Sequence, residues 1–165
     1  MGTRSVIGVM HGDNCKSVYC HWDGYLGYNG RILQEHFDSA KANHLVALGD
    51  LSSLRPEIGE KHPFSQFGLN KEDPDYDEQI ALYEKAEALG WCTFYGRDRG
   101  ETGTEWKVTN TFEAFLDRVH GCGADYYYIM KDGVWYVGAV YEVEGLFKDG
   151  LVPLNEALAN VKEEA

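Results

Sequence analysis

The spacing of apolar and polar side chains predicts six short strands, arranged along the chain as three neighbouring pairs. The six segments are residues 5–9, 17–22, 91–95, 106–109, 126–130 and 134–143. Turn-forming or charged residues separate the two members of each pair, and the clearest turn is Lys131-Asp132-Gly133. Because strands joined by short turns pair antiparallel, the pattern predicts three hairpins in a mainly antiparallel sheet.

Apolar residues at helical spacing predict three or four helices, at residues 31–48, 74–89, 111–120 and 153–162. The first of them can also be divided in two, because Asp38-Ser39 is suited to cap a new helix. Asp73 and Pro74 are suited to begin the second helix, and Gly90 to end it. The expected buried residues are Tyr76, Ile80, Tyr83 and Leu89 in the second helix, and Phe112, Phe115, Leu116 and Val119 in the third.

Together these elements predict an α+β fold in which three or four helices pack on a sheet of about six strands. A chain of 165 residues is long enough for one full hydrophobic core and short for two, so we expect a single domain over residues 1–165. Residues 51–72 show no regular period and are expected to form an irregular loop. Residues 24–30 are rich in glycine, and we expect a tight turn there.

Negative charge is concentrated in one part of the chain. The formal net charge is −12, and nine acids against three lysines give residues 57–87 half of it. Such a field repels nucleic-acid phosphates, so we expect no direct binding of nucleic acid. It favours a partner protein with a basic surface. The candidate acidic partner surface is Asp73, Asp75, Asp77 and Glu78.

The four cysteines, at positions 15, 20, 92 and 122, lack the paired spacing that is typical of zinc sites. The first residues lack the apolar core of a signal peptide, and no apolar run approaches membrane-spanning length. These features predict a cytoplasmic protein with free thiols, no membrane association, and no metal or other cofactor.

Residues 19–28 concentrate side chains that are suited to recognition. Alternation along the strand places Val18, Cys20 and Trp22 on one face and Tyr19, His21 and Asp23 on the other. The first set is the more apolar, so we expect Trp22 in the core, whereas we expect Tyr25 to be exposed. The candidate binding surface is Tyr19, His21, Asp23, Tyr25, Tyr28 and Arg31. The alternative is that some of these tyrosines simply fill the core.

Two further functions stay open at this point. Aromatic rings that stack on a base, with Arg4 or Arg31 pairing with phosphate, would bind a small nucleotide-like ligand. A cysteine close to a histidine would suit a small hydrolase, but Cys20 and His21 point to opposite faces of one strand. No familiar catalytic motif is present, so the sequence favours a non-enzymatic protein without a catalytic residue.

Three stretches of the chain resemble a family of small, largely uncharacterised proteins encoded by bacteriophages and prophage-bearing bacteria. They are Thr3-Arg4-Ser5, residues 19–25 (YCHWDGY) followed by Asn29-Gly30, and residues 48–54 (LGDLSSL). The resemblance covers the first third of the chain and implies a phage accessory context, with no activity to transfer. By analogy, we expect a protein that binds a host factor in the host cytoplasm, in an anti-defence or host-takeover role.

Overall fold

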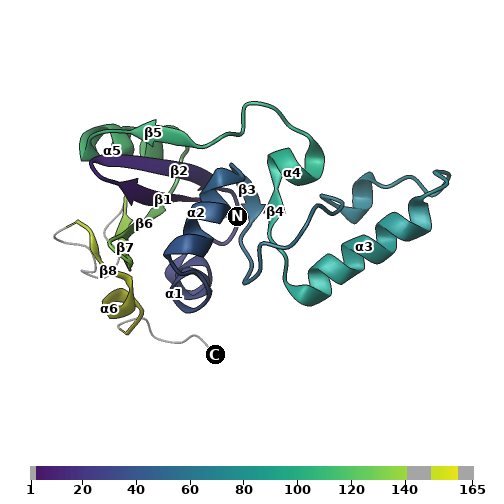
Figure 1. Ribbon diagram of the computed structural model, residues 1–165, viewed down its shortest axis with the longest axis horizontal. Coiled ribbons are helices and arrows are strands. Elements are labelled where there is room, and N and C mark those ends of the chain that lie inside the picture. Colours follow the sequence, from purple (N-terminus) through teal and green to yellow (C-terminus); the bar gives the residue numbers. More distant parts are fainter. Residues whose placement is uncertain (1–2, 141–149, 160–165) are drawn as a thin grey trace.

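A computed structural model describes residues 3–140 and 150–159 of the chain. In these residues, a sheet of eight strands carries helices on both faces (Figure 1). The strands are β1 (Ser5–His11), β2 (Asn14–Cys20), β3 (Leu51–Ser53), β4 (Thr93–Phe94), β5 (Lys107–Thr109), β6 (Tyr126–Lys131), β7 (Val134–Ala139) and β8 (Val152–Pro153). Their order across the sheet is β4-β3-β2-β1-β6-β7-β8, and β5 pairs with the first half of β2.

The predicted α+β class is confirmed, but the sheet has more strands than expected and is mixed. β1 runs parallel to β6, and β2 runs parallel to β3. The β1–β2 and β6–β7 hairpins form as predicted. The expected hairpin of residues 91–95 and 106–109 is wrong, because β4 pairs with β3 and β5 pairs with β2. Residues 141–143, assigned to the last predicted strand, lie outside the described residues.

The described residues contain six α-helices, more than the three or four expected. They are α1 (Arg31–His36), α2 (Ser39–Ala47), α3 (Tyr76–Leu89), α4 (Tyr95–Arg99), α5 (Phe112–Gly121) and α6 (Leu154–Ala159). Asp38 divides the first predicted helix in two, since its side chain accepts a hydrogen bond from the amide of Lys41. Thr111 caps α5 in the same way through the amide of Ala114. None of the helices in the described ranges is long and apolar enough to cross a membrane.

Two shorter elements replace irregular structure that the sequence suggested. A π-helix, η1 (Leu26–Gly30), stands where a tight turn was expected. A single 3-10 turn, η2 (Gln66–Gly68), lies in the segment predicted as a loop, which also contains β3. Residues 160–162 of the predicted terminal helix lie outside the described residues.

Two apolar cores lie on opposite faces of the sheet. The larger core contains Ile7 of β1 and is covered by α1, α2 and α6, which contribute Leu33 and Leu45 among others. The smaller core contains Val6 of β1 and is covered by α5, which contributes Phe115. Val6 and Ile7 are neighbours in sequence but belong to different cores, as the alternation of side chains along a strand requires.

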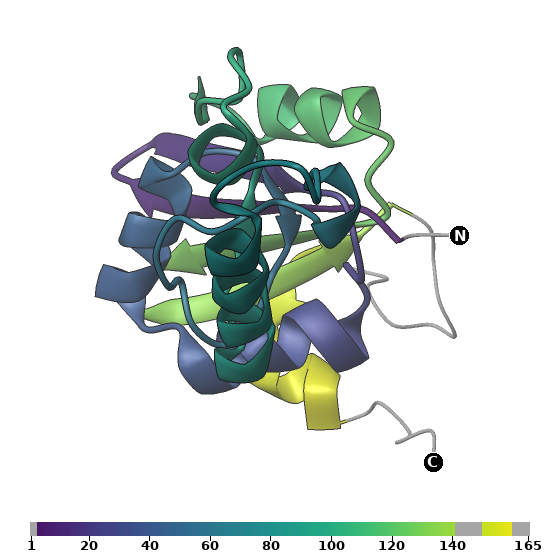
Figure 2. The same ribbon diagram turned by 90° about the vertical axis from the view of Figure 1, so that its right-hand side faces the viewer.

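Residues 57–90, called the arm from here on, project from the β3–β4 end of the sheet (Figures 1 and 2). The chain runs outward through residues 57–75 and returns through α3. Only Ala86 is buried among the 14 residues of α3. The predicted buried face is therefore wrong, since Leu89 is exposed and the other three residues are only half-buried.

The start of α3 also differs from the prediction, whereas its end does not. The helix begins at Tyr76 instead of Pro74, because Asp73 closes a turn in which its carbonyl accepts a hydrogen bond from the Tyr76 amide. Gly90 ends the helix in the left-handed region, with φ +68°, a conformation that glycine adopts without strain.

Gly138 of β7 provides a test of the smaller core. It faces Tyr127 of β6, and a β-carbon at position 138 would lie 2.3 Å from Cζ of that ring. We expect Gly138→Ala to displace the ring and to lower the free energy of unfolding by about 1–3 kcal/mol. Gly121→Ala in α5 is the control, because nothing lies within 4 Å of its β-carbon position. Urea unfolding of both variants measures the difference, and equal stabilities would contradict this packing.

Candidate functional site

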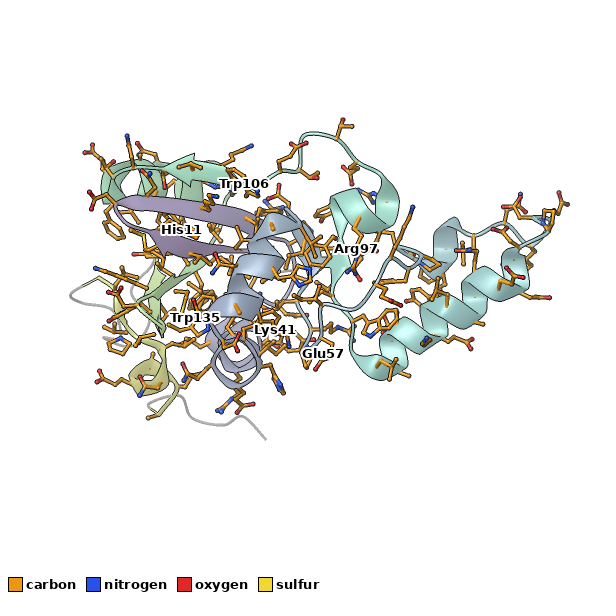
Figure 3. The ribbon with its side chains drawn as sticks, viewed as in Figure 1. His11, Lys41, Glu57, Arg97, Trp106 and Trp135 are labelled. Carbon is orange, nitrogen blue, oxygen red and sulfur yellow. The ribbon has the colours of Figure 1, made fainter. Side chains whose placement is uncertain are left out.

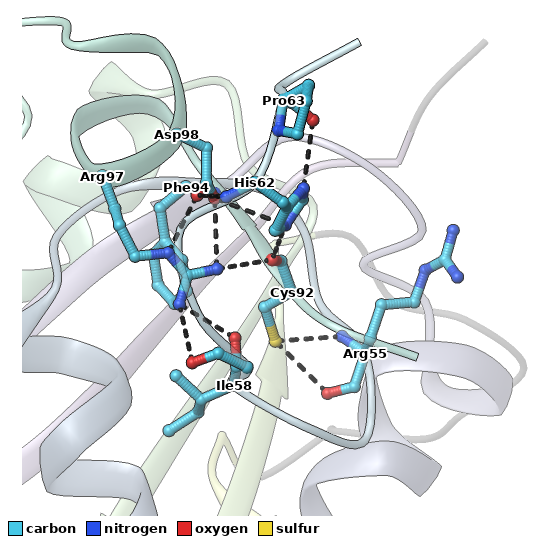
Figure 4. A network of polar contacts seen from close by, with 9 residues as sticks. Arg55, Ile58, His62, Pro63, Cys92, Phe94, Arg97 and Asp98 are labelled. Atoms are coloured by element: carbon cyan, nitrogen blue, oxygen red, sulfur yellow. Dashed lines mark hydrogen bonds and ion pairs between the residues drawn. The ribbon is translucent and has the colours of Figure 1, made fainter. Parts of the chain in front are cut away.

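A buried carboxylate fastens the arm to the end of the sheet. The side chain of Asp98 in α4 is fully buried, and its oxygens accept hydrogen bonds from the amides of His62 (3.1 Å) and Phe94 (2.8 Å). Arg97 donates to the same two oxygens from Nε (2.9 Å) and Nη2 (3.2 Å) (Figure 4). Asp98 therefore ties the outgoing chain of the arm to β4 and α4.

Arg97 extends this network into the backbone at the start of the arm. Its Nη1 donates to the carbonyls of Ile58 (3.0 Å) and Gly59 (3.2 Å), and its Nη2 donates to that of Cys92 (2.9 Å). The guanidinium suits this role because its donors have a fixed, planar arrangement. These bonds compensate for the cost of removing two charged side chains from water.

His62 is the third member of this network, which we call the anchor (Arg97, Asp98 and His62). Its Nδ1 lies 3.0 Å from the carbonyl oxygen of Pro63, and its Nε2 lies 2.8 Å from that of Cys92. Its Nε2 also lies 3.6 Å from the Asp98 carboxylate.

Further contacts fix the arm beside the anchor. Lys41 of α2 lies 3.8 Å from the carboxylate of Glu57, and the two residues lie together in Figure 3. Gly59 has a φ of +70° and lies against the indole of Trp91, where a β-carbon would come within 2.2 Å of the ring. Glu57 and Trp91 also form an isolated β-bridge. The outgoing and returning segments of the arm are thus joined where the arm meets the sheet.

The candidate acidic partner surface lies on the part of the arm that projects. Asp73, Asp75, Asp77 and Glu78 are all exposed, and among the described residues none of them forms an ion pair. Asp77 and Glu78 lie in the first turn of α3, where the helix dipole stabilises negative charge. Phe67, also on the arm, is 90 % exposed.

The six residues of the candidate binding surface form two groups in the structure. Tyr19 and His21 lie on the face of the sheet that carries α5, and the Tyr19 hydroxyl is 2.6 Å from Nδ1 of His21. Burial raises the pKa of Tyr19 and lowers the pKa of His21, and the nearby Arg4 guanidinium lowers both. His21 is therefore mainly neutral at neutral pH, and its hydrogen bond with Tyr19 joins two uncharged side chains.

The second group lies around η1. The rings of Tyr25 and Tyr28 are 6.2 Å apart, and the carbonyl of Asp23 accepts a hydrogen bond from the Asn29 amide. Asp23 adopts a φ of +57°, which turns the chain from β2 into η1. Arg31 follows as the first residue of α1. Within the described residues, no ring contact joins this group to Tyr19 and His21.

The expected exposure of Tyr25 is confirmed, and the expected burial of Trp22 is wrong. Both side chains are 44 % exposed. Val18 and Cys20 do face the larger core, as the alternation predicts. Trp22 lies two residues beyond the end of β2 at Cys20, and its ring contacts that of His21 edge to face instead of entering the core.

Arg55 pairs with the arm, and its charge also acts on Tyr28 of the second group. Burial raises the pKa of Tyr28, and the charge of Arg55 opposes that rise. The Nη2 of Arg55 lies 3.3 Å from the carboxylate of Glu87 in α3. Burial and the charge of Glu87 likewise raise the pKa of Tyr83, which Arg55 lowers. The charge of Arg55 therefore acts on a tyrosine of η1 and on a tyrosine of α3.

The four cysteines lack the properties of a nucleophile. Burial raises the pKa of Cys15 and Cys92 to about 11, and that of Cys20 to about 12. Burial also raises the pKa of Cys122, which is half-buried. The thiols are therefore protonated at neutral pH, and the hydrolase alternative gains no support from them. No group of three or more metal-binding side chains occurs among the residues that the structure describes.

The anchor was not foreseen from the sequence. His62 falls in a segment predicted as an irregular loop and Asp98 in the loop of a hairpin that does not form, so nothing in the pattern placed them together. The charged run Arg97-Asp98-Arg99 is the one signal that could have drawn notice. Such runs are usually exposed, and only the structure shows that Asp98 is buried while Arg99 is not.

Comparison of the chain with models of known protein families, with curated proteins and with solved structures finds no match. The function of the protein is therefore inferred from its own residues and their arrangement.

Removal of the buried carboxylate tests the anchor. We expect Asp98→Ala to lower the free energy of unfolding by about 3–5 kcal/mol, because Arg97 would remain buried without its partner. Glu101→Ala is the matched control, since Glu101 pairs with Arg99 at the surface and the loss of such a pair costs less than about 1 kcal/mol. Urea unfolding of both variants gives the comparison. A loss no greater than that of the control would show that the carboxylate does not hold the arm.

Alkylation tests the protonation of the thiols. A pKa of about 11 in place of 9.0 lowers the thiolate fraction at neutral pH roughly a hundredfold, so iodoacetamide should label Cys15 far more slowly than it labels glutathione. We expect half-buried Cys122 to react first and buried Cys20 last, with all four reacting readily after unfolding. Peptide mass spectrometry over time measures the rates. A native cysteine that reacts faster than glutathione would revive the hydrolase alternative.

Proposed function

We propose that this protein is a non-enzymatic binding protein that docks on the basic surface of a partner protein through its acidic arm and the tyrosines at η1. The observation that carries this proposal is the exposure of α3, a 14-residue helix with one buried side chain. On the resemblance noted above, the partner would be a host protein, and binding would serve an anti-defence or host-takeover role.

The charge of the arm supports this proposal. The projecting acids are held on a framework that is fastened at its base, so their charges have a defined position relative to the body of the protein. A concentrated negative field of this kind accelerates the encounter with a positively charged surface and disfavours partners of like charge.

Exposed apolar and aromatic side chains support it as well. Phe67 and Leu89 are 90 % and 52 % exposed on the arm, and Tyr25, directly before η1, is 44 % exposed. Aromatic residues dominate the binding energy of protein interfaces when they become desolvated at the centre. The acids would therefore govern the rate of association, and the aromatic residues the lifetime of the complex.

Charge reversal of the acidic partner surface tests the proposal. A variant with Asp73, Asp75, Asp77 and Glu78 replaced by lysine should capture less of the partner from a host lysate at low ionic strength. With the captured partner purified, we expect the association rate to fall about tenfold or more, and its dependence on salt to weaken. Stopped-flow measurements over a range of salt concentrations determine both.

The control variant reverses four exposed acids outside the arm: Glu35, Glu105, Glu113 and Asp117. Each reversal adds two positive charges, so both variants have a formal net charge of −4 in place of −12. We expect the control to associate at nearly the rate of the unmodified protein. Equal effects of the two variants would show that net charge matters and the arm does not, which would contradict the proposal.

A further inference from the structure

A cavity of about 360 Å³ lies between α5 and the sheet, on the face opposite to α1 and α2. Its floor is formed by Met10 of β1, Cys15 of β2 and Ile129 of β6, and its wall by Phe112 and Phe115 of α5. Pockets that bind small molecules begin at about 300 Å³. The cavity therefore has the size for a compact ligand of one or two rings.

The wall of the cavity is aromatic. The rings of Phe112 and Phe115 are 6.3 Å apart and nearly parallel, and both meet the ring of Tyr127 edge to face. Phe112 was expected inside the core, but its side chain is 46 % exposed beside the cavity. Stacking a second flat apolar group on an exposed ring at the edge of an apolar cavity removes the ring from water, which is favourable in free energy.

The charges near the cavity lie at its rim. Asp13 lines it from the β1–β2 turn and Lys131 from the end of β6. Both are exposed, and their opposite signs favour neither an anion nor a cation. The cysteine in the floor is an uncharged thiol. A charged ligand would lose its hydration on entering the cavity and would find no ionic partner there, which disfavours its binding.

One polar atom beside the cavity lacks a partner. Oγ1 of Thr109, the last residue of β5, is buried and makes no hydrogen bond within the described structure. Thr109 also lines the cavity. A rotation about its Cα–Cβ bond moves the hydroxyl to another staggered position, so the hydroxyl can be turned toward a ligand. A buried hydroxyl without a partner is costly, and a ligand that bonds to it would remove that cost.

We propose that this cavity binds a compact, uncharged aromatic molecule that carries one hydrogen-bonding group, held by Phe112 and Phe115 and bonded to Thr109. The site lies under α5, away from the acidic arm, and is independent of the function proposed above. Binding of such a ligand would make the protein a carrier or sensor of a small aromatic compound as well as a partner of another protein.

Two probes that differ by one hydrogen-bonding group test this inference. Indole has an N–H group, and indene has nearly the same shape without it. Titration of the full-length protein, followed by amide chemical shifts, should show shifts centred on Phe115 and Ile129 for both probes. We expect indole to bind about fivefold more tightly than indene, as one hydrogen bond predicts.

Two variants separate the contributions of the wall and the hydroxyl. Thr109→Val should lower the affinity for indole about fivefold and leave that for indene unchanged, whereas Phe112→Ala should lower both, by roughly three- to tenfold. Both substitutions are expected to leave the fold intact, because Phe112 is partly exposed and valine is close in shape to threonine. Shifts that are absent from Phe115 and Ile129, or affinities that neither variant changes, would overturn the proposal.

Discussion

The buried carboxylate of Asp98 is the constraint on which the shape of this protein depends. α3 buries a single side chain, so its own packing contributes little to holding it in place. The position of the arm is instead set where it leaves the body, by the hydrogen bonds that Asp98 and Arg97 make with the backbone of β4 and of the outgoing chain. A carboxylate and a guanidinium are stable at low exposure only while these bonds are all made. The base of the arm is therefore stable when all of these hydrogen bonds are made, and it is strongly destabilised when one of them is lost.

This constraint gives the acidic surface a physical meaning that composition alone does not. Acids on a mobile loop would form a diffuse field, whereas these acids lie in the first turn of α3 and directly before it, on an arm that is fastened at its base. The guanidinium of Arg55 pairs with Glu87 near the end of α3, and its charge opposes the rise in the pKa of Tyr28 in η1. The arm itself carries both exposed acids and an exposed aromatic ring, that of Phe67, and these are the features that favour rapid and lasting association.

The sequence predicts those helix ends and hairpins that depend on neighbouring residues. It does not predict the features that depend on contacts between distant segments. The caps at Asp38 and Thr111, the helix end at Gly90 and the two tight hairpins all depend on neighbouring residues. The parallel pairing of β1 with β6 joins segments more than 100 residues apart, and no local pattern encodes it. The concentration of acids could be read from the chain, but their projection, the anchor and the cavity under α5 could not. Each of these is assembled from segments that only the fold brings together.

Hydrogen–deuterium exchange of the protein, alone and in complex with its purified partner, tests the central claim most directly. If the acidic arm is the docking surface, partner binding will slow amide exchange in α3, in residues 66–75 and around η1, while the β6–β7 hairpin and α5 remain unchanged. Protection confined to α5 and the sheet, with exchange in α3 the same in both samples, would contradict the account and would place the partner on the opposite side of the molecule.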